Sequence, residues 1–124
     1  MSLKANVRRV GDVAIVDLTG RITLGEGSGL VRGTIKDLVI SGEKNILVNL
    51  KDVTYLDSAG LGEVVGAYAT VTNAGGSIKL LHPQAKVHDI LQITKLYTVF
   101  SAFDDEMEAL RSFAAAAAGG KLFL

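Results

Sequence analysis

The chain has 124 residues, 48% of them hydrophobic, and its 13 lysines and arginines balance 13 aspartates and glutamates. This length supports one domain that buries roughly two-thirds of the unfolded surface, and the balanced charge argues against direct nucleic-acid binding. There is no cysteine, which excludes disulfides, thiolate catalysis and cysteine-ligated metals and favours a cytoplasmic location. Because the first residues lack an apolar signal core and no apolar run is long enough to cross a bilayer, we expect neither secretion nor a membrane span.

The N-terminal part is expected to form a β-hairpin followed by a helix. Residues 7–10 and 13–18 are strand-like, and Gly11-Asp12 between them suits a two-residue turn because glycine tolerates positive φ. Residues 30–39 carry apolar side chains at helical spacing, and Ser41-Gly42 supplies the helix end.

The middle of the chain is expected to form a strand, a helix and a second strand. Residues 45–50 are mostly apolar and are interpreted as a largely buried strand, whereas residues 58–73 have helical periodicity. Gly75-Gly76 then releases the chain into a strand over residues 77–81. Such a unit is expected to be right-handed.

The C-terminal part is expected to add two helices and a short strand. Pro83 suits the first turn of a third helix, where its missing N–H would lack a partner in any case. Residues 98–103 indicate a short strand, and Asp105 with Glu108 resembles a capping box for a last helix. An alanine run prolongs that helix until Gly119-Gly120 ends it.

This alternation of strands and helices predicts an α/β fold class. We expect a small, mainly parallel or mixed sheet with an antiparallel hairpin edge and about four helices packed against it. A single domain is expected over residues 1–118, with a C-terminal tail over residues 119–124.

The most informative motif is Asp57-Ser58-Ala59-Gly60-Leu61-Gly62, between the middle strand and its helix. Sites form there in open α/β sheets because free backbone N–H groups converge on anions. Ser58 is a candidate helix cap and a candidate phosphoacceptor, and the two roles are compatible. Asp57 either orders the loop by accepting backbone hydrogen bonds or assists a partner's nucleotide–Mg²⁺ chemistry. Gly60 and Gly62 permit close backbone approach, to a partner or to the chain's own sheet.

Other candidate sites are weaker. The Gly-x-Ser-x-Gly pattern is absent around Ser58, and neither His82 nor His88 has a sequence cue for a catalytic or metal role. We therefore expect no enzyme, no metal site and no cofactor. Residues 25–29 lack the Gly-Lys-Ser/Thr ending of a P-loop and are interpreted as a flexible turn, with Ser28 as a candidate cap.

Over nearly its whole length the chain resembles the STAS domain of bacterial anti-sigma factor antagonists. The resemblance rests on the hairpin, the glycine-containing turn and helix, the hexapeptide in its register, and Gly75-Gly76 before the next strand. It implies the same fold and identifies Ser58 as the matching phosphoacceptor. The partner-binding residues that we expect are Asp57, Ser58, Ala59, Gly60, Leu61, Gly62, Thr23 and Leu24.

The resemblance implies a phosphorylation-controlled binding module that acts as a monomer or weak dimer. Unmodified, it would dock an anti-sigma factor that is also an ATP-dependent serine kinase, and so free a sigma factor for transcription. Phosphorylation of Ser58 would end docking, and a serine phosphatase would reset the cycle. Family members often carry an acidic residue soon after the second strand, where this chain has Arg21-Ile22-Thr23-Leu24. This difference bears on partner identity, since the loop lies beside the phosphoserine in family structures.

Two other interpretations stay open. The chain could be a STAS scaffold or subunit in a stress-signalling or lipid or anion transport complex. Alternatively it could be a small nucleotide- or ligand-binding domain, for which residues 25–29 are the only pointer.

Overall fold

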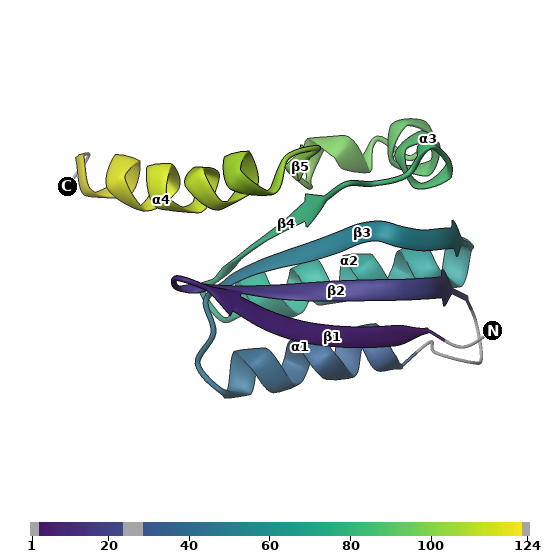
Figure 1. The fold of residues 1–124 in the computed structure, drawn as a ribbon, viewed down its shortest axis with the longest axis horizontal. Helices are drawn as coiled ribbons and strands as arrows, with labels where there is room; N and C mark the ends of the chain where they lie inside the picture. Colours follow the sequence, from purple (N-terminus) through teal and green to yellow (C-terminus); the bar gives the residue numbers. More distant parts are fainter. Residues whose placement is uncertain (1–2, 24–28, 123–124) are drawn as a thin grey trace.

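A computed structural model describes residues 3–23 and 29–122 of the chain and shows a mixed α/β fold (Figure 1). Its strands form one sheet in the order β1-β2-β3-β4-β5. The strands are β1 (Lys4–Val10), β2 (Val13–Ile22), β3 (Asn45–Leu56), β4 (Ser77–Leu81) and β5 (Ala102–Phe103). The helices are α1 (Leu30–Ile40), α2 (Ser58–Asn73), α3 (Ala85–Ile93), the 3-10 helix η1 (Leu96–Thr98) and α4 (Glu106–Leu122).

The sheet has the expected mixed topology. β1 and β2 pair as an antiparallel hairpin, and the three following pairs, from β2/β3 to β4/β5, are parallel. Gly11 in the hairpin turn has φ +60°, and Gly42 and Gly75, which follow α1 and α2, also have positive φ. The predicted α/β class, with a hairpin edge and four helices, is confirmed.

β3 extends further than its sequence pattern indicated, ending at Leu56 rather than at residue 50. The alternating pattern breaks because the pairing with β2 is irregular at two points, the first where Asp17 faces Asn49 but Thr19 faces Asp52. An extra residue in one strand reverses the inside–outside alternation beyond it. The buried side chain of Val53 therefore falls out of phase with the preceding strand pattern.

The C-terminal region departs from expectation in three places. Gln84 is the N-cap of α3, so Pro83 precedes the helix instead of occupying its first turn. The strand expected over residues 98–103 is reduced to the two residues of β5, because Thr98 and Val99 bond to local carbonyls within and beside η1. α4 continues through Gly119-Gly120 to Leu122, so these glycines do not end it.

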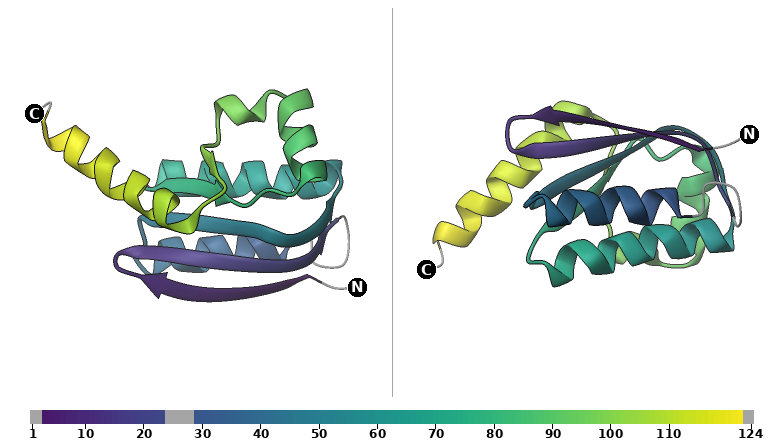
Figure 2. Two further views of the ribbon diagram at one scale, coloured as in Figure 1. Left: turned by 45° about the horizontal axis from the view of Figure 1, so that its top comes forward. Right: turned by 90° about the horizontal axis from the view of Figure 1, so that it is seen from below.

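Helices cover the two faces of the sheet unequally. α1 and α2 lie side by side on one face, and α4 lies against the other (Figure 2). The larger core, on the α1–α2 face, includes Ile22, Leu50 and Val64 and also receives side chains from α3. Each fully buried aliphatic side chain of this kind contributes roughly 1.5–3 kcal/mol.

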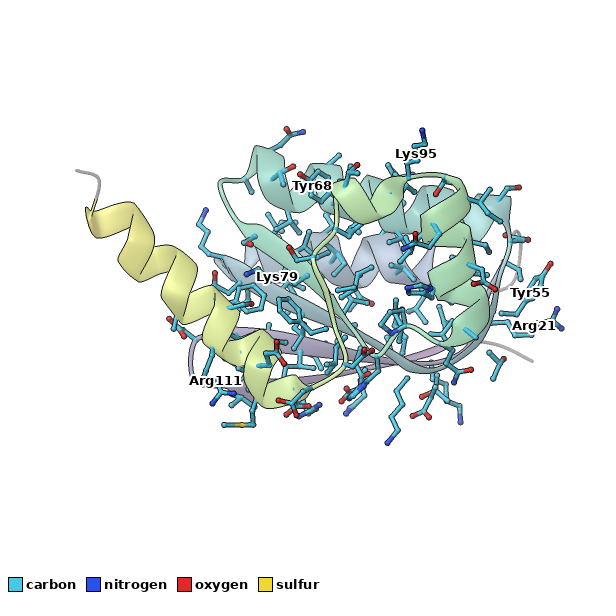
Figure 3. All side chains as sticks on the ribbon, turned by 90° about the horizontal axis from the view of Figure 1, so that it is seen from above. Arg21, Tyr55, Tyr68, Lys79, Lys95 and Arg111 are labelled. Atoms are coloured by element: carbon cyan, nitrogen blue, oxygen red, sulfur yellow. The ribbon has the colours of Figure 1, made fainter. Side chains whose placement is uncertain are left out.

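The smaller core anchors α4 to the sheet. Ala109 and Phe113 pack on buried side chains of β2, β3 and β4. The Lys79 ammonium lies 4.7 Å from the Phe113 ring centroid and donates a hydrogen bond to Ser112 Oγ at 2.9 Å (Figure 3). Burial lowers the pKa of Lys79. Its long side chain therefore fastens α4 to β4 by both polar and aromatic contact.

A polar network ties the hairpin to the start of α4. Arg8 Nε donates to Asp17 at 2.7 Å and Arg8 Nη2 donates to Glu106 at 2.5 Å, while Asn49 donates to Asp17 at 2.8 Å. The hydrogen bond from Arg8 lowers the pKa of Glu106. Burial acts to raise the pKa of Asp17, but the hydrogen bonds from Arg8 and Asn49 outweigh it, so that pKa is lowered as well.

The network predicts an acid-labile contribution to stability. Because both carboxyl pKa values are depressed by folding, the contribution is complete above about pH 5 and is lost as the pH falls through the folded-state values. Arg8→Met should lower the free energy of unfolding by about 1 kcal/mol at pH 7, and by less at acidic pH, since these side chains are partly exposed. Urea titrations between about pH 3 and 7 measure this. Arg111→Met, which removes an exposed charge from α4, is the control. A loss that does not vary with pH would contradict the assignment.

Candidate functional site

The candidate site lies where the carboxyl end of β3 passes directly into α2. Asp57 joins the two elements in an extended conformation, with φ −97° and ψ −176°, and is the N-cap of α2. Its Oδ1 accepts a hydrogen bond from the Gly60 amide at 2.7 Å. The interpretation of Ser58 as the cap is therefore wrong, whereas the loop-ordering role considered for Asp57 is confirmed.

Ser58 occupies the first position of α2 and is exposed, and Ala59 beside it is half-buried. The first backbone N–H groups of a helix lack intrahelical acceptors, and the helix dipole favours negative charge there by about 0.3–1 kcal/mol. Ser58 thus lies at a surface position where the helix dipole favours negative charge. A capping serine would have turned its hydroxyl back toward the helix; Asp57 leaves Ser58 out of that role.

Gly60 lets α2 begin directly against the end of β2. The residue is buried, and a Cβ atom placed there would collide with the backbone carbonyl of Ile22 and meet the Leu56 side chain at 2.8 Å. The Asp57 amide also donates to the Ile22 carbonyl at 3.3 Å. Of the two alternatives for Gly60, the structure thus shows close approach to the chain's own sheet.

The rest of the motif divides between core and surface. Leu61 is half-buried and packs on the larger core, whereas Gly62 is exposed and a Cβ atom there would have no neighbour within 4 Å. Thr23, just after β2, is half-buried. Leu24 lies outside the described residues, as do Ser28 and most of the glycine-rich turn. Gly62 is therefore a place where another molecule's backbone can approach closely.

Two features beside the motif could not be found from sequence spacing. A groove of about 510 Å³ runs between α1 and α2, and its lining includes Arg32, Lys36 and Glu63. At the strand ends, the Arg21 guanidinium lies 4.8 Å from the centroid of the Tyr55 ring (Figure 3). Both features join residues far apart in the chain. The groove depends on helix packing and the Arg21–Tyr55 pair on strand register, so neither can be recognised from a short stretch of the sequence.

Within the described residues, no group of three or more histidines, aspartates or glutamates is placed to hold a metal ion. His82 follows β4 with φ +53° and donates its amide to the Phe103 carbonyl at 2.7 Å, while His88 is an exposed residue of α3. Among the residues that the structure describes, no helix has the length and apolar character needed to cross a bilayer.

The model of the STAS domain family matches residues 4–109. The chain belongs to the STAS domain family. It is 27% identical over 111 residues to the anti-sigma F factor antagonist of Paenibacillus polymyxa, covering 89% of this chain and 94% of that protein. It is 30% identical over 96 residues to the anti-sigma-B factor antagonist of Bacillus subtilis, covering 77% and 86% respectively.

A solved structure shares the fold of this STAS domain. The Bacillus cell fate determinant SpoIIAA in its phosphorylated form superimposes with a TM-score of 0.70 at 20% identity, covering 89% of this chain and 99% of that one. The expected family and fold are therefore shown.

The two glycines of the motif should respond oppositely to alanine. Gly60→Ala forces a methyl group into the Ile22 carbonyl and should lower the free energy of unfolding by about 3 kcal/mol or more. Gly62→Ala adds a methyl group in open space and should raise it by about 0.5–1 kcal/mol through helix propensity. Urea unfolding of the two variants beside the parent chain measures both. Equal effects would contradict the packing described for Gly60.

Proposed function

We propose that this STAS domain is an anti-sigma factor antagonist switched by phosphorylation of Ser58. Unmodified, it docks an anti-sigma factor with serine kinase activity and so frees a sigma factor to engage RNA polymerase in the cytoplasm. Phosphoserine ends the docking, and a serine phosphatase restores it. The chain binds and is modified but catalyses nothing itself.

The exposure of Ser58 is the observation that carries this proposal. A kinase can phosphorylate a hydroxyl only where its active site reaches it, and Ser58 stands at the surface end of α2 while Asp57 takes the capping role. The curated relatives are named as antagonists of anti-sigma factors, and the SpoIIAA structure of the same fold carries a phosphate. The names of the relatives support the role, and the exposure of Ser58 supports the choice of residue.

The fold and the interface would respond differently to the phosphate. At the helix N-terminus the added charge is favourable by about 0.3–1 kcal/mol, so α2 survives the modification. A partner carboxylate about 6 Å from the phosphate would cost roughly 2.8 kcal/mol per unit charge at an effective dielectric near 20. Since about 1.4 kcal/mol changes affinity tenfold, one modification suffices to end docking.

The proposed docking surface surrounds this hydroxyl. Ser58, Ala59 and Gly62 form its exposed or half-buried part on α2, and Thr23 adds the residue that follows β2. Asp57 and Gly60 shape this surface from beneath by holding α2 against β2. Gly62 leaves room for a partner's backbone on the exposed side of the helix.

Removing the hydroxyl should separate docking from modification. Ser58→Ala should keep the fold, because the N-cap bond belongs to Asp57. It should bind the kinase with an affinity within about twofold of the parent and accept no phosphate. The measurement is calorimetry and radiolabel transfer from ATP, with each serine-kinase anti-sigma factor of the source organism purified in turn. Label on the variant at the parent stoichiometry would refute Ser58 as the acceptor.

A fixed charge at this position should imitate the phosphate. Ser58→Asp should fold with unchanged or slightly higher stability and bind the anti-sigma factor about tenfold more weakly or worse. Asn73→Asp is the matched control, since it adds the same charge at the opposite end of α2, on an exposed residue. Calorimetry of both variants shows whether the loss of affinity requires the charge at residue 58 or follows from any added negative charge on α2. Equal affinities would count against control by charge.

A further inference from the structure

An arginine and a tyrosine form a preassembled pair at the sheet edge where α2 begins. Arg21 on β2 and Tyr55 on β3 are opposite each other in the parallel register, and the guanidinium lies 4.8 Å from the ring centroid. Figure 3 shows both side chains projecting together from this end of the molecule. Tyr55 precedes Ser58 by three residues, so the pair borders the proposed docking surface.

The charge of Arg21 is held in place but is not neutralised within the described residues. Arg8, Arg9 and Arg32 each have a carboxylate within 4.0 Å, whereas Arg21 has the Tyr55 ring as its contact. Stacking on an aromatic face leaves the donors at the edge of the guanidinium open to a further group. Arg21 is exposed, and 38% of the Tyr55 surface remains accessible.

The surrounding strand ends are also cationic. Lys4 faces Thr19 across the hairpin, and Thr19 faces Asp52, next to Lys51. Three exposed residues at these strand ends are positive, namely Lys4, Lys51 and Arg21. Asp52 is an exposed carboxylate, whereas the carboxylate of Asp57 is half-buried and accepts the Gly60 amide. An acidic surface is therefore complementary to this edge of the sheet.

We propose that the Arg21–Tyr55 pair binds a carboxylate-bearing segment of the anti-sigma factor, which extends the docking surface from α2 onto the ends of β2 and β3. This inference rests on the proposed function. A guanidinium offers a carboxylate two parallel hydrogen bonds, and stacking on the ring reduces the freedom that arginine loses on binding. Arginine and tyrosine are also the residue types that dominate interface energies.

The proposed role of the pair also identifies what a phosphate on Ser58 would repel. A partner segment chosen for its negative charge is the kind of segment that phosphoserine at the same edge repels. Phosphorylation adds anionic charge where Arg21 and its neighbours attract an acidic group, so it lowers the potential that brings the partner in. The same carboxylates would thus take part in docking and in release.

Charge reversal tests the proposal against a matched control. Arg21→Glu should weaken binding of the anti-sigma factor, identified as the one that binds the parent chain, by about tenfold or more at 0.1 M salt. Arg111→Glu makes the same change on an exposed arginine of α4, which lies on the opposite side of the molecule from Arg21 in Figure 3, and should change affinity less than about twofold. Circular dichroism and urea unfolding confirm that both variants fold.

Two further measurements separate stacking from general attraction. Tyr55→Phe keeps the ring and should bind as the parent does within about twofold, whereas Tyr55→Ala should lose about fivefold or more. Raising the salt from about 0.05 to 0.5 M should weaken parent binding more steeply than binding of Arg21→Glu.

Each outcome decides one claim. Loss of binding in Arg21→Glu and Tyr55→Ala but not in Arg111→Glu supports the pair as the carboxylate site. If Ser58→Asp abolishes binding while Arg21→Glu binds like Arg111→Glu, the inference is overturned and the proposed function stands. If the parent chain binds none of the serine-kinase anti-sigma factors, the proposed function fails and this inference with it.

Discussion

The structure of the site depends on how closely the start of α2 approaches the end of β2. Gly60 has no side chain to keep the helix away from the Ile22 carbonyl, and the Asp57 amide bonds to that same carbonyl. This contact fixes the direction in which α2 leaves the sheet. Because the helix start is held by backbone groups and by the Asp57 carboxylate, it does not rely on the exposed Ser58 side chain.

The hexapeptide therefore contains two kinds of residue, those that hold the fold together and those that face outward. Asp57 and Gly60 serve the fold, one by satisfying a helix-end amide and the other by being small, while Ser58 and Gly62 face outward. An exposed glycine inside a helix costs about 1 kcal/mol relative to alanine, and nothing in the surrounding described structure requires one at residue 62. The proposed docking surface, in which a partner's backbone approaches Gly62 closely, would account for this cost.

On the face of the sheet that α4 covers, the carboxyl ends of β2 and β3 stay exposed. α4 packs over the amino-terminal half of the strands, where Ile15 and Leu47 are buried, and Lys79 and Arg8 fasten it there. The carboxyl ends of β2 and β3 carry polar and charged side chains instead, including Arg21 and Tyr55. On the face that α4 covers, burial near the start of the strands and exposure at their carboxyl ends follow from this division of residues. On the opposite face, Ile22, Val53 and Leu56 at the same strand ends are buried in the larger core.

Local pattern alone determined the hairpin, α1, α2 and β4, because helical spacing, two-residue alternation and turn glycines act over a few neighbouring residues. It also singled out Ser58, since the hexapeptide is contiguous. Tertiary contacts decided the irregular register of β3 and the meeting of Arg21 with Tyr55. The capping of α2 by Asp57 was decided locally, by which of two adjacent side chains takes the cap position. Each of these depends on segments distant in the chain or on competition between neighbouring side chains, and pairing across a sheet is set by burial of whole strands. No single stretch of sequence records that outcome.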